Sequence, residues 1–162
     1  MTRLRELLGA ARSRLADAPR EAVGELVQPR RLLGIARAPR IVPHGEAWHL
    51  GVLLLTPDAV LATGEVVRSR VPARRGYTAE NQRRRAELAE AAHRGGYPEG
   101  ATVHVGWTEL DVDAVERGEA SGPLSLVDGE PMVRWSAAAA PQPLAAYLDE
   151  RVELLRHPPE GA

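Results

Sequence analysis

Glu46–Val71, with the sequence EAWHLGVLLLTPDAVLATGEVVRSRV, limits how the rest of the chain can be arranged. Its first half predicts a strand with apolar side chains on both faces, which is typical of the interior of a sheet. Thr56–Asp58 predicts a β-turn, because its proline presets the backbone angle and its aspartate accepts local hydrogen bonds. The second half predicts a returning strand interrupted at Gly64 by a bulge or a close backbone approach. We therefore expect a long antiparallel hairpin in the centre of a sheet.

Hydrophobic periodicity predicts further elements on both sides of this hairpin. Helices are expected at residues 2–16, 21–27, 79–92, 112–117 and 143–156, and strands at residues 32–36, 101–110, 124–127 and 132–135. Thr2 and Thr78 are suited to cap the helices that follow them, and Gly95–Gly96 to end the third helix. Asp128–Gly129 predicts a tight hairpin turn. In residues 101–110 the alternation places Val103, Val105 and Trp107 inward and Thr102, His104 and Thr108 outward.

The order of these elements predicts an α+β fold with helices at the N-terminus, in the middle and at the C-terminus. Because the strands follow one another in hairpins, we expect an antiparallel sheet of about five to seven strands, which can curl into a half-barrel. Residues 1–28 are expected to form a helical segment packed on a single α+β domain made of residues 29–162.

Composition and length exclude several classes of protein. Of 162 residues, 44% are hydrophobic and 27% are charged, as in globular domains. No apolar run approaches the roughly 20 residues that a membrane-spanning helix needs. The N-terminus is too rich in charge for a signal peptide. We therefore expect a cytoplasmic protein without a membrane partner.

Cysteine, lysine and phenylalanine are absent, so all 21 basic residues are arginines. Without cysteine the chain forms neither a disulfide nor a thiolate nucleophile. Without lysine it forms no Schiff base, no Ser–Lys dyad and no P-loop phosphate contact. No serine lies in a Gly-x-Ser-x-Gly context. These absences exclude many enzyme classes, and nothing in the sequence identifies a cofactor.

Basic side chains are concentrated in the segment Arg68–Arg85. It contains Arg68, Arg70, Arg74, Arg75, Arg83, Arg84 and Arg85 against the single acidic residue Glu80. Arg74, Arg75 and the triplet Arg83–Arg85 are candidate anion-binding residues, since a guanidinium donates paired hydrogen bonds to phosphate or carboxylate. Alternatively, the glutamates that follow the triplet pair with it along one helix. The net charge of −1 argues against nucleic acid and leaves an acidic partner or a solvated, internally paired helix.

Histidines and one glutamate are the candidates for chemistry. Five histidines are present, His44, His49, His93, His104 and His157. His49 and His104 lie in predicted strands and, with His44 or Glu46 nearby, could form a two-histidine, one-carboxylate metal set. The alternative is a scatter of histidines on partly exposed strands, and no metal site is assigned. Glu65 follows Gly64 in the hairpin, where a carboxylate is either a buried base or simply exposed to water. His49, His104 and Glu65 are therefore the candidate catalytic residues.

Four short stretches resemble a known group of proteins. They are VPHG at Val42–Gly45, HLGVLLL at His49–Leu55, ATGEV at Ala62–Val66 and RGGY at Arg94–Tyr97. Together they resemble small, mostly uncharacterised proteins of high-GC Gram-positive bacteria, some of which bear the label glutaminase. The resemblance implies a bacterial origin and brings no catalytic residues with it. Serine-type glutaminases need Ser-x-x-Lys and amidotransferase-type ones need Cys, so a chain without lysine and cysteine cannot be either.

These patterns favour a non-catalytic module that binds another protein or itself. Exposed helices at both ends and opposed basic and acidic segments would provide the contacts. In a homodimer the N-terminal helix or the acidic residues from Glu109 onward would meet the arginine-rich segment. Two alternatives stay open. One is a small-ligand-binding or metal-dependent enzyme that uses His and Glu of the central sheet. The other is a phosphate or nucleic-acid binder that uses Arg68–Arg85.

Overall fold

A computed structural model describes the whole chain except residues 1, 30–32, 36, 75, 77–78 and 162. The chain forms two compact units. Unit 1 comprises Met1–Arg20, Ala47–Thr63 and Thr108–Ala162, and unit 2 comprises Glu21–Glu46 and Gly64–Trp107. The predicted division into residues 1–28 and 29–162 remains a prediction.

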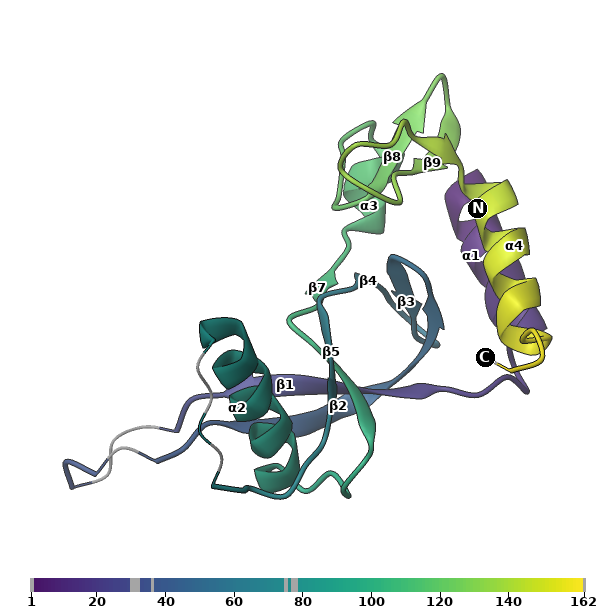
Figure 1. The fold of residues 1–162 in the computed structure, drawn as a ribbon. Coiled ribbons are helices and arrows are strands. Elements are labelled where there is room, and N and C mark those ends of the chain that lie inside the picture. The colour runs from purple at the N-terminus through teal and green to yellow at the C-terminus, as the bar shows by residue number, and fades with distance from the viewer. Residues whose placement is uncertain (1, 30–32, 36, 75, 77–78, 162) are drawn as a thin grey trace. The chain divides into compact units, whose positions relative to one another are not determined.

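The described residues form an α+β structure, as predicted (Figure 1). Its helices are α1 Arg3–Arg14, α2 Glu80–Arg94, α3 Val112–Glu116 and α4 Leu144–Arg156. Its strands are β1 Glu21–Val27, β2 Arg40–Leu50, β3 Leu53–Leu55, β4 Val60–Ala62, β5 Glu65–Arg68, β6 Thr102–Val105, β7 Thr108–Glu109, β8 Leu124–Val127, β9 Glu130–Val133 and β10 Gln142–Pro143.

The main sheet is mixed, which corrects the prediction of a purely antiparallel sheet. Its seven described strands follow the order β5-β6-β1-β2-β3-β4-β7, and this open order has two ends. β1 pairs with β6 in parallel, with Ala22 opposite Val103, whereas β6 pairs with β5 in antiparallel fashion. Sequence patterns indicate hairpins between neighbouring segments, but they do not indicate pairing between segments as distant as β1 and β6. A separate three-stranded sheet has the order β10-β9-β8.

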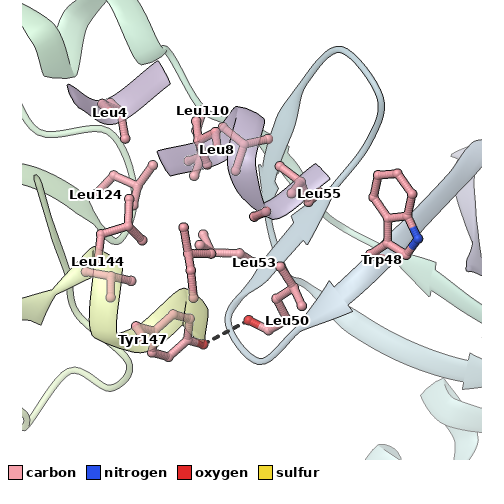
Figure 2. Close-up of a cluster of buried hydrophobic side chains, with 14 of the residues drawn as sticks. Leu4, Leu8, Trp48, Leu50, Leu53, Leu55, Leu110, Leu124, Leu144 and Tyr147 are labelled. Atoms are coloured by element: carbon pink, nitrogen blue, oxygen red, sulfur yellow. Dashed lines mark hydrogen bonds between the residues drawn. The ribbon is translucent and has the colours of Figure 1, made fainter. Parts of the chain in front are cut away.

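Unit 1 is built around a core of aliphatic side chains from α1, α4 and the β2–β3–β4 strands (Figure 2). Leu4 and Leu8 recur on one face of α1 and are buried there, as the helical spacing predicts. α1 packs beside α4, whose Tyr147 is one of the largest fully buried side chains. Thr2 precedes α1 as predicted, but its hydroxyl hydrogen-bonds the Glu116 carboxylate instead of capping the helix.

The predicted single strand before Thr56 is two strands joined by a tight turn. β2 ends at Leu50, and β3 returns antiparallel to it, with Leu50 opposite Leu53. Gly51 permits this reversal because its φ is 65° and because a side chain there would overlap the Tyr147 hydroxyl. Periodicity did not indicate the turn, since apolar residues continue across it. The predicted turn at Thr56–Asp58 is confirmed, and Thr56 N–H donates to Ala59 O at 3.0 Å.

Unit 2 has its own core between α2 and the strands β5, β6 and β2. Val67, Leu88, Ala91 and Val103 are among the residues that form it. α2 ends at Arg94, as the glycine pair after it predicted. Gly95 is required for packing, because a Cβ there would overlap the Ile41 carbonyl of β2. Gly64 is a close-approach point as predicted, since a Cβ there would meet the backbone at Val105 and Gly106.

Residues 21–27 form strand β1 and not the predicted helix. Pairing with β6 overrides local helix propensity here, and Gly24 lets Ile41 and Val103 pack closely against the strand. Of the predicted strand 32–36, residues 32 and 36 lie outside the described residues and the intervening residues form a turn and an isolated bridge. Thr78, the predicted cap, also lies outside them. The predictions of α3, α4 and the β8–β9 hairpin are confirmed.

Candidate functional site

A groove lies in unit 2 between strand β5 and helix α2, and we call it the β5–α2 groove. Its volume is about 680 Å³, inside the range of about 300–1,000 Å³ typical of ligand-binding pockets. One wall is Glu65–Arg68 with Arg70, and the other is Gln82, Arg85, Ala86 and Ala89. The four residues of the second wall are at positions i, i+3, i+4 and i+7 of α2, so they share one face of the helix. Small alanines on that face leave room between helix and strand.

β5 stands at one end of the sheet, and its outer edge has no strand beside it among the described residues. The hydrogen bonds of Ser69 show which backbone groups form that edge. Its N–H donates to Ala101 O at 2.8 Å and its C=O accepts from Gly100 N–H at 2.7 Å, so both face the β6 side. Because successive residues of an antiparallel strand face opposite edges, the N–H and C=O of Val66 and Arg68 face outward.

The outer edge of β5 is turned toward α2. Arg70 lies two residues beyond Arg68 and shares its edge by the same alternation. The Arg70 N–H donates to the Ala89 carbonyl of α2 at 3.1 Å. Strand and helix therefore meet at Arg70, and farther back along β5 they leave the groove open between them. Within the described chain, neither Val66 nor Arg68 has a backbone bond on this side.

The side chains of β5 alternate between two environments. Val67 is buried in the core under α2, and Glu65 is on the same side, where Arg84 of α2 binds its carboxylate at 2.5 Å. Val66 is directed to the other face and is 54% exposed. Glu65 is thus an exposed, ion-paired surface carboxylate, and nothing in its surroundings favours the buried base that was one reading of the sequence.

The arginine-rich segment is only partly gathered at the groove. Arg68, Arg70 and Arg85 line it, while Arg70 approaches Glu90 at 4.0 Å. Arg84 is engaged with Glu65. Arg74 and Arg83 are exposed and are not among the lining residues. Arg75 lies outside the described residues. The predicted anion-binding set therefore contributes Arg85 to the groove.

The candidate histidines occupy different units. His104 of β6 is fully buried in unit 2, which corrects the prediction of an outward side chain, and its Nε2 lies 2.5 Å from Glu21 Oε2. His49 belongs to unit 1, where its Nε2 lies 3.0 Å from Gly51 O. A metal site shared by the two histidines therefore stays a prediction. The rings of His44 and Trp107 are in contact, tilted at 46° with centroids 4.4 Å apart, and Glu46 is exposed.

The chain matches no known family model, and no curated protein or solved structure shows significant similarity to it. The resemblance to proteins of high-GC Gram-positive bacteria accordingly stays a prediction. Among the described residues, no helix combines the length and the apolar character needed to cross a membrane.

Sequence reasoning named the charged residues of the segment but missed the groove itself. Val66, Gln82, Ala86 and Ala89 were not candidates, although all line it. A usable signal was present in α2, where alanine occupies positions at which a core-facing helix ordinarily has larger aliphatic side chains. No sequence pattern indicated that one edge of β5 is unpaired, because local periodicity does not determine the order of strands in a sheet.

Proposed function

We propose that the protein is a non-catalytic interaction module that binds an extended segment of another protein by strand addition to β5. The observation that supports this most is the outward-facing backbone of Val66 and Arg68 beside an open groove. In β-strand addition, main-chain hydrogen bonds to a sheet edge supply affinity and neighbouring pockets supply selectivity. The β5–α2 groove offers both in one place.

The geometry of the groove suits a single strand. An added strand runs about 4.8 Å from the strand with which it pairs, so it would lie between β5 and the α2 wall. Val66 and Arg68 would each donate one hydrogen bond to it and accept one from it. The buried Ala86 and half-buried Ala89 give the α2 wall a small-residue surface that a backbone can approach.

A proline at position 66 tests strand addition with little damage to the sheet. Val66 N–H faces away from β6, so Val66→Pro removes an outward donor and no β5–β6 hydrogen bond. Val66→Thr is the matched control, because it keeps the N–H and the branched β-carbon. We expect a random-peptide display library, selected on the wild-type protein, to yield peptides that bind Val66→Thr and fail to bind Val66→Pro. If no selected peptide distinguishes the two variants, strand addition at β5 is wrong.

The same pair of variants distinguishes a partner from a second copy. Self-association through β5 would appear as a dimer by size-exclusion chromatography with light scattering, and Val66→Pro would abolish it. We expect the wild type and both variants to have the same mass at concentrations where peptides bind. The predicted homodimer is thereby tested separately, since its interface can lie elsewhere.

A second candidate function is metal binding, and one observation favours it. Glu21 and the fully buried His104 place a carboxylate oxygen 2.5 Å from an imidazole nitrogen in unit 2. This is a hydrogen-bonding contact, so the two groups would have to move apart for one ion with bonds of about 2.0–2.2 Å to bind both. Both groups are zinc ligands, and a zinc ion would need further ligands besides this pair. Native mass spectrometry after dialysis against Zn²⁺ tests the idea. One tightly bound zinc, lost in Glu21→Gln and kept in the control Glu25→Gln on the same strand, is the expected result; a metal-free mass excludes it.

A further inference from the structure

We infer that the segment accepted by the β5–α2 groove is acidic and alternating, with a carboxylate directed toward α2 and an apolar residue on the opposite face beside Val66. This inference depends on the proposed function and names the chemistry of the partner. It is drawn from the charges of the lining residues and from the side-chain alternation of β5.

The charge of the groove is positive where a ligand would lie. Its lining includes three arginines and one carboxylate, Glu65. That carboxylate is bound by Arg84 at 2.5 Å, and Arg70 lies 4.0 Å from Glu90. Arg68 and Arg85 form no ion pair with any described residue. A carboxylate on the partner would therefore gain charge-assisted hydrogen bonds, whereas a basic segment would meet uncompensated like charge.

Alternation decides where on the partner the carboxylate belongs. Side chains of an added strand point to the same two faces as those of β5, and directly opposed residues on one face touch. On the α2 face the added strand meets Arg85 and Gln82, which present guanidinium and amide donors. A glutamate or aspartate there satisfies both.

The opposite face selects an apolar residue. Val66 is exposed there, and a cross-strand apolar pair removes its side chain from water. Arg68 stands two residues along on the same face, so a second acidic residue beside it would continue the pattern. The preferred segment thus has an apolar residue flanked by acidic ones, in an extended conformation without proline.

Nucleic acid fits this groove less well than an acidic strand. The outward C=O groups of Val66 and Arg68 are acceptors and need donors. A protein strand provides N–H groups at the required spacing, but a phosphodiester backbone has acceptors only along its phosphates. The net charge of −1 adds no general attraction for a polyanion.

The test uses the display selection with two arginine variants. Arg85→Gln removes the charge that faces the groove, and Arg83→Gln is the control, an exposed arginine on the same helix that does not line it. We expect selected peptides to be enriched in Asp and Glu beside an apolar residue. For a synthetic peptide of the selected sequence, Arg85→Gln should raise Kd about tenfold, equivalent to about 1.4 kcal/mol, and Arg83→Gln less than about twofold.

Each other outcome has a definite meaning. The acidic specificity is wrong if the selected peptides contain no excess of acidic residues, or if their binding responds equally to both arginine variants. Strand addition still holds in either case, provided that the peptides lose binding in Val66→Pro. Peptides indifferent to Val66→Pro overturn both. A single-stranded oligonucleotide that displaces the peptide and loses its own affinity in Arg85→Gln would make a polyanion the occupant and overturn the inference.

Discussion

Tyr147 offers the sharpest test of how unit 1 is held together. Its hydroxyl donates to Leu50 O at 2.9 Å (Figure 2) and accepts from Val52 N–H at 2.8 Å. One side chain of α4 therefore bonds both sides of the β2–β3 turn. The residue is 1% exposed. Tyr147→Phe keeps the ring and leaves both backbone groups without this partner. A buried group left unsatisfied costs about 1–3 kcal/mol, so for the two groups together we expect unit 1 to lose about 2–6 kcal/mol.

Tyr97→Phe in unit 2 is the matched control. Its hydroxyl contacts Val23 O at 3.4 Å, beyond the about 2.5–3.0 Å of a good O–H···O bond. Removing so weak a bond should cost less than about 1 kcal/mol. The two variants therefore make the same chemical change with different expected effects.

Urea denaturation and amide hydrogen exchange measure the difference. The denaturation midpoint gives the change in the free energy of unfolding, and exchange at the Val52 amide gives the local effect. In Tyr147→Phe we expect both a lower midpoint and faster exchange at Val52. If the two variants lose equal stability, or if Val52 keeps its protection in Tyr147→Phe, the hydroxyl does not stabilise the turn and the reasoning is refuted.

Two further perturbations test other parts of the molecule. Gly95→Ala should strongly destabilise unit 2, because its methyl group would overlap the Ile41 carbonyl. Gly96→Ala, at φ 106° in open space, should cost only the about 1–3 kcal/mol of a residue held in a sparsely populated backbone conformation. Equal melting temperatures for the two variants would contradict this. The hydrogen bond from Arg14 holds the pKa of Glu153 below its ordinary value of 4.5. The stability that this pair contributes is therefore complete above pH 4.5 and is lost as pH falls through the lower folded value. Glu153→Gln should slightly reduce the loss of unfolding free energy between pH 4.5 and lower pH, and the effect is small because the pair is exposed. If the variant loses as much stability over this pH range as the wild type, the pair contributes nothing.

The elements that the sequence predicted correctly are those whose signals are local. α1 follows from leucines at helical spacing, and the β8–β9 turn follows from Asp128–Gly129, whose φ angles of 50° and 78° suit a primed turn. α2 ends where its glycines predicted. In each case the determining contacts lie within a few residues, so a window of sequence contains the information.

The errors arise where distant segments decide the structure. Residues 21–27 have an acceptable helical composition, but they pair in parallel with β6, a partner about eighty positions away (Ala22 opposite Val103). His104 alternates with valines and was predicted to face outward, yet it is fully buried, and its cross-strand neighbours are Val23 of β1 and Val66 of β5. The uninterrupted apolar run of the central hairpin concealed the turn at Gly51. Local periodicity gives the face of a strand only when that strand's neighbours are known.

Three features protect the open edge of β5 from indiscriminate pairing. Exposed strand edges invite aggregation, and natural proteins limit this by keeping the edge short, charging it or covering it. β5 has only four residues and ends in the charged Arg68, and α2 covers the edge just beyond it at Arg70. A broad sheet from another molecule is therefore obstructed by the helix and repelled if it is basic. A single extended segment with negative charge meets neither obstacle, so the features that guard the edge against indiscriminate pairing are also the ones that would select such a partner.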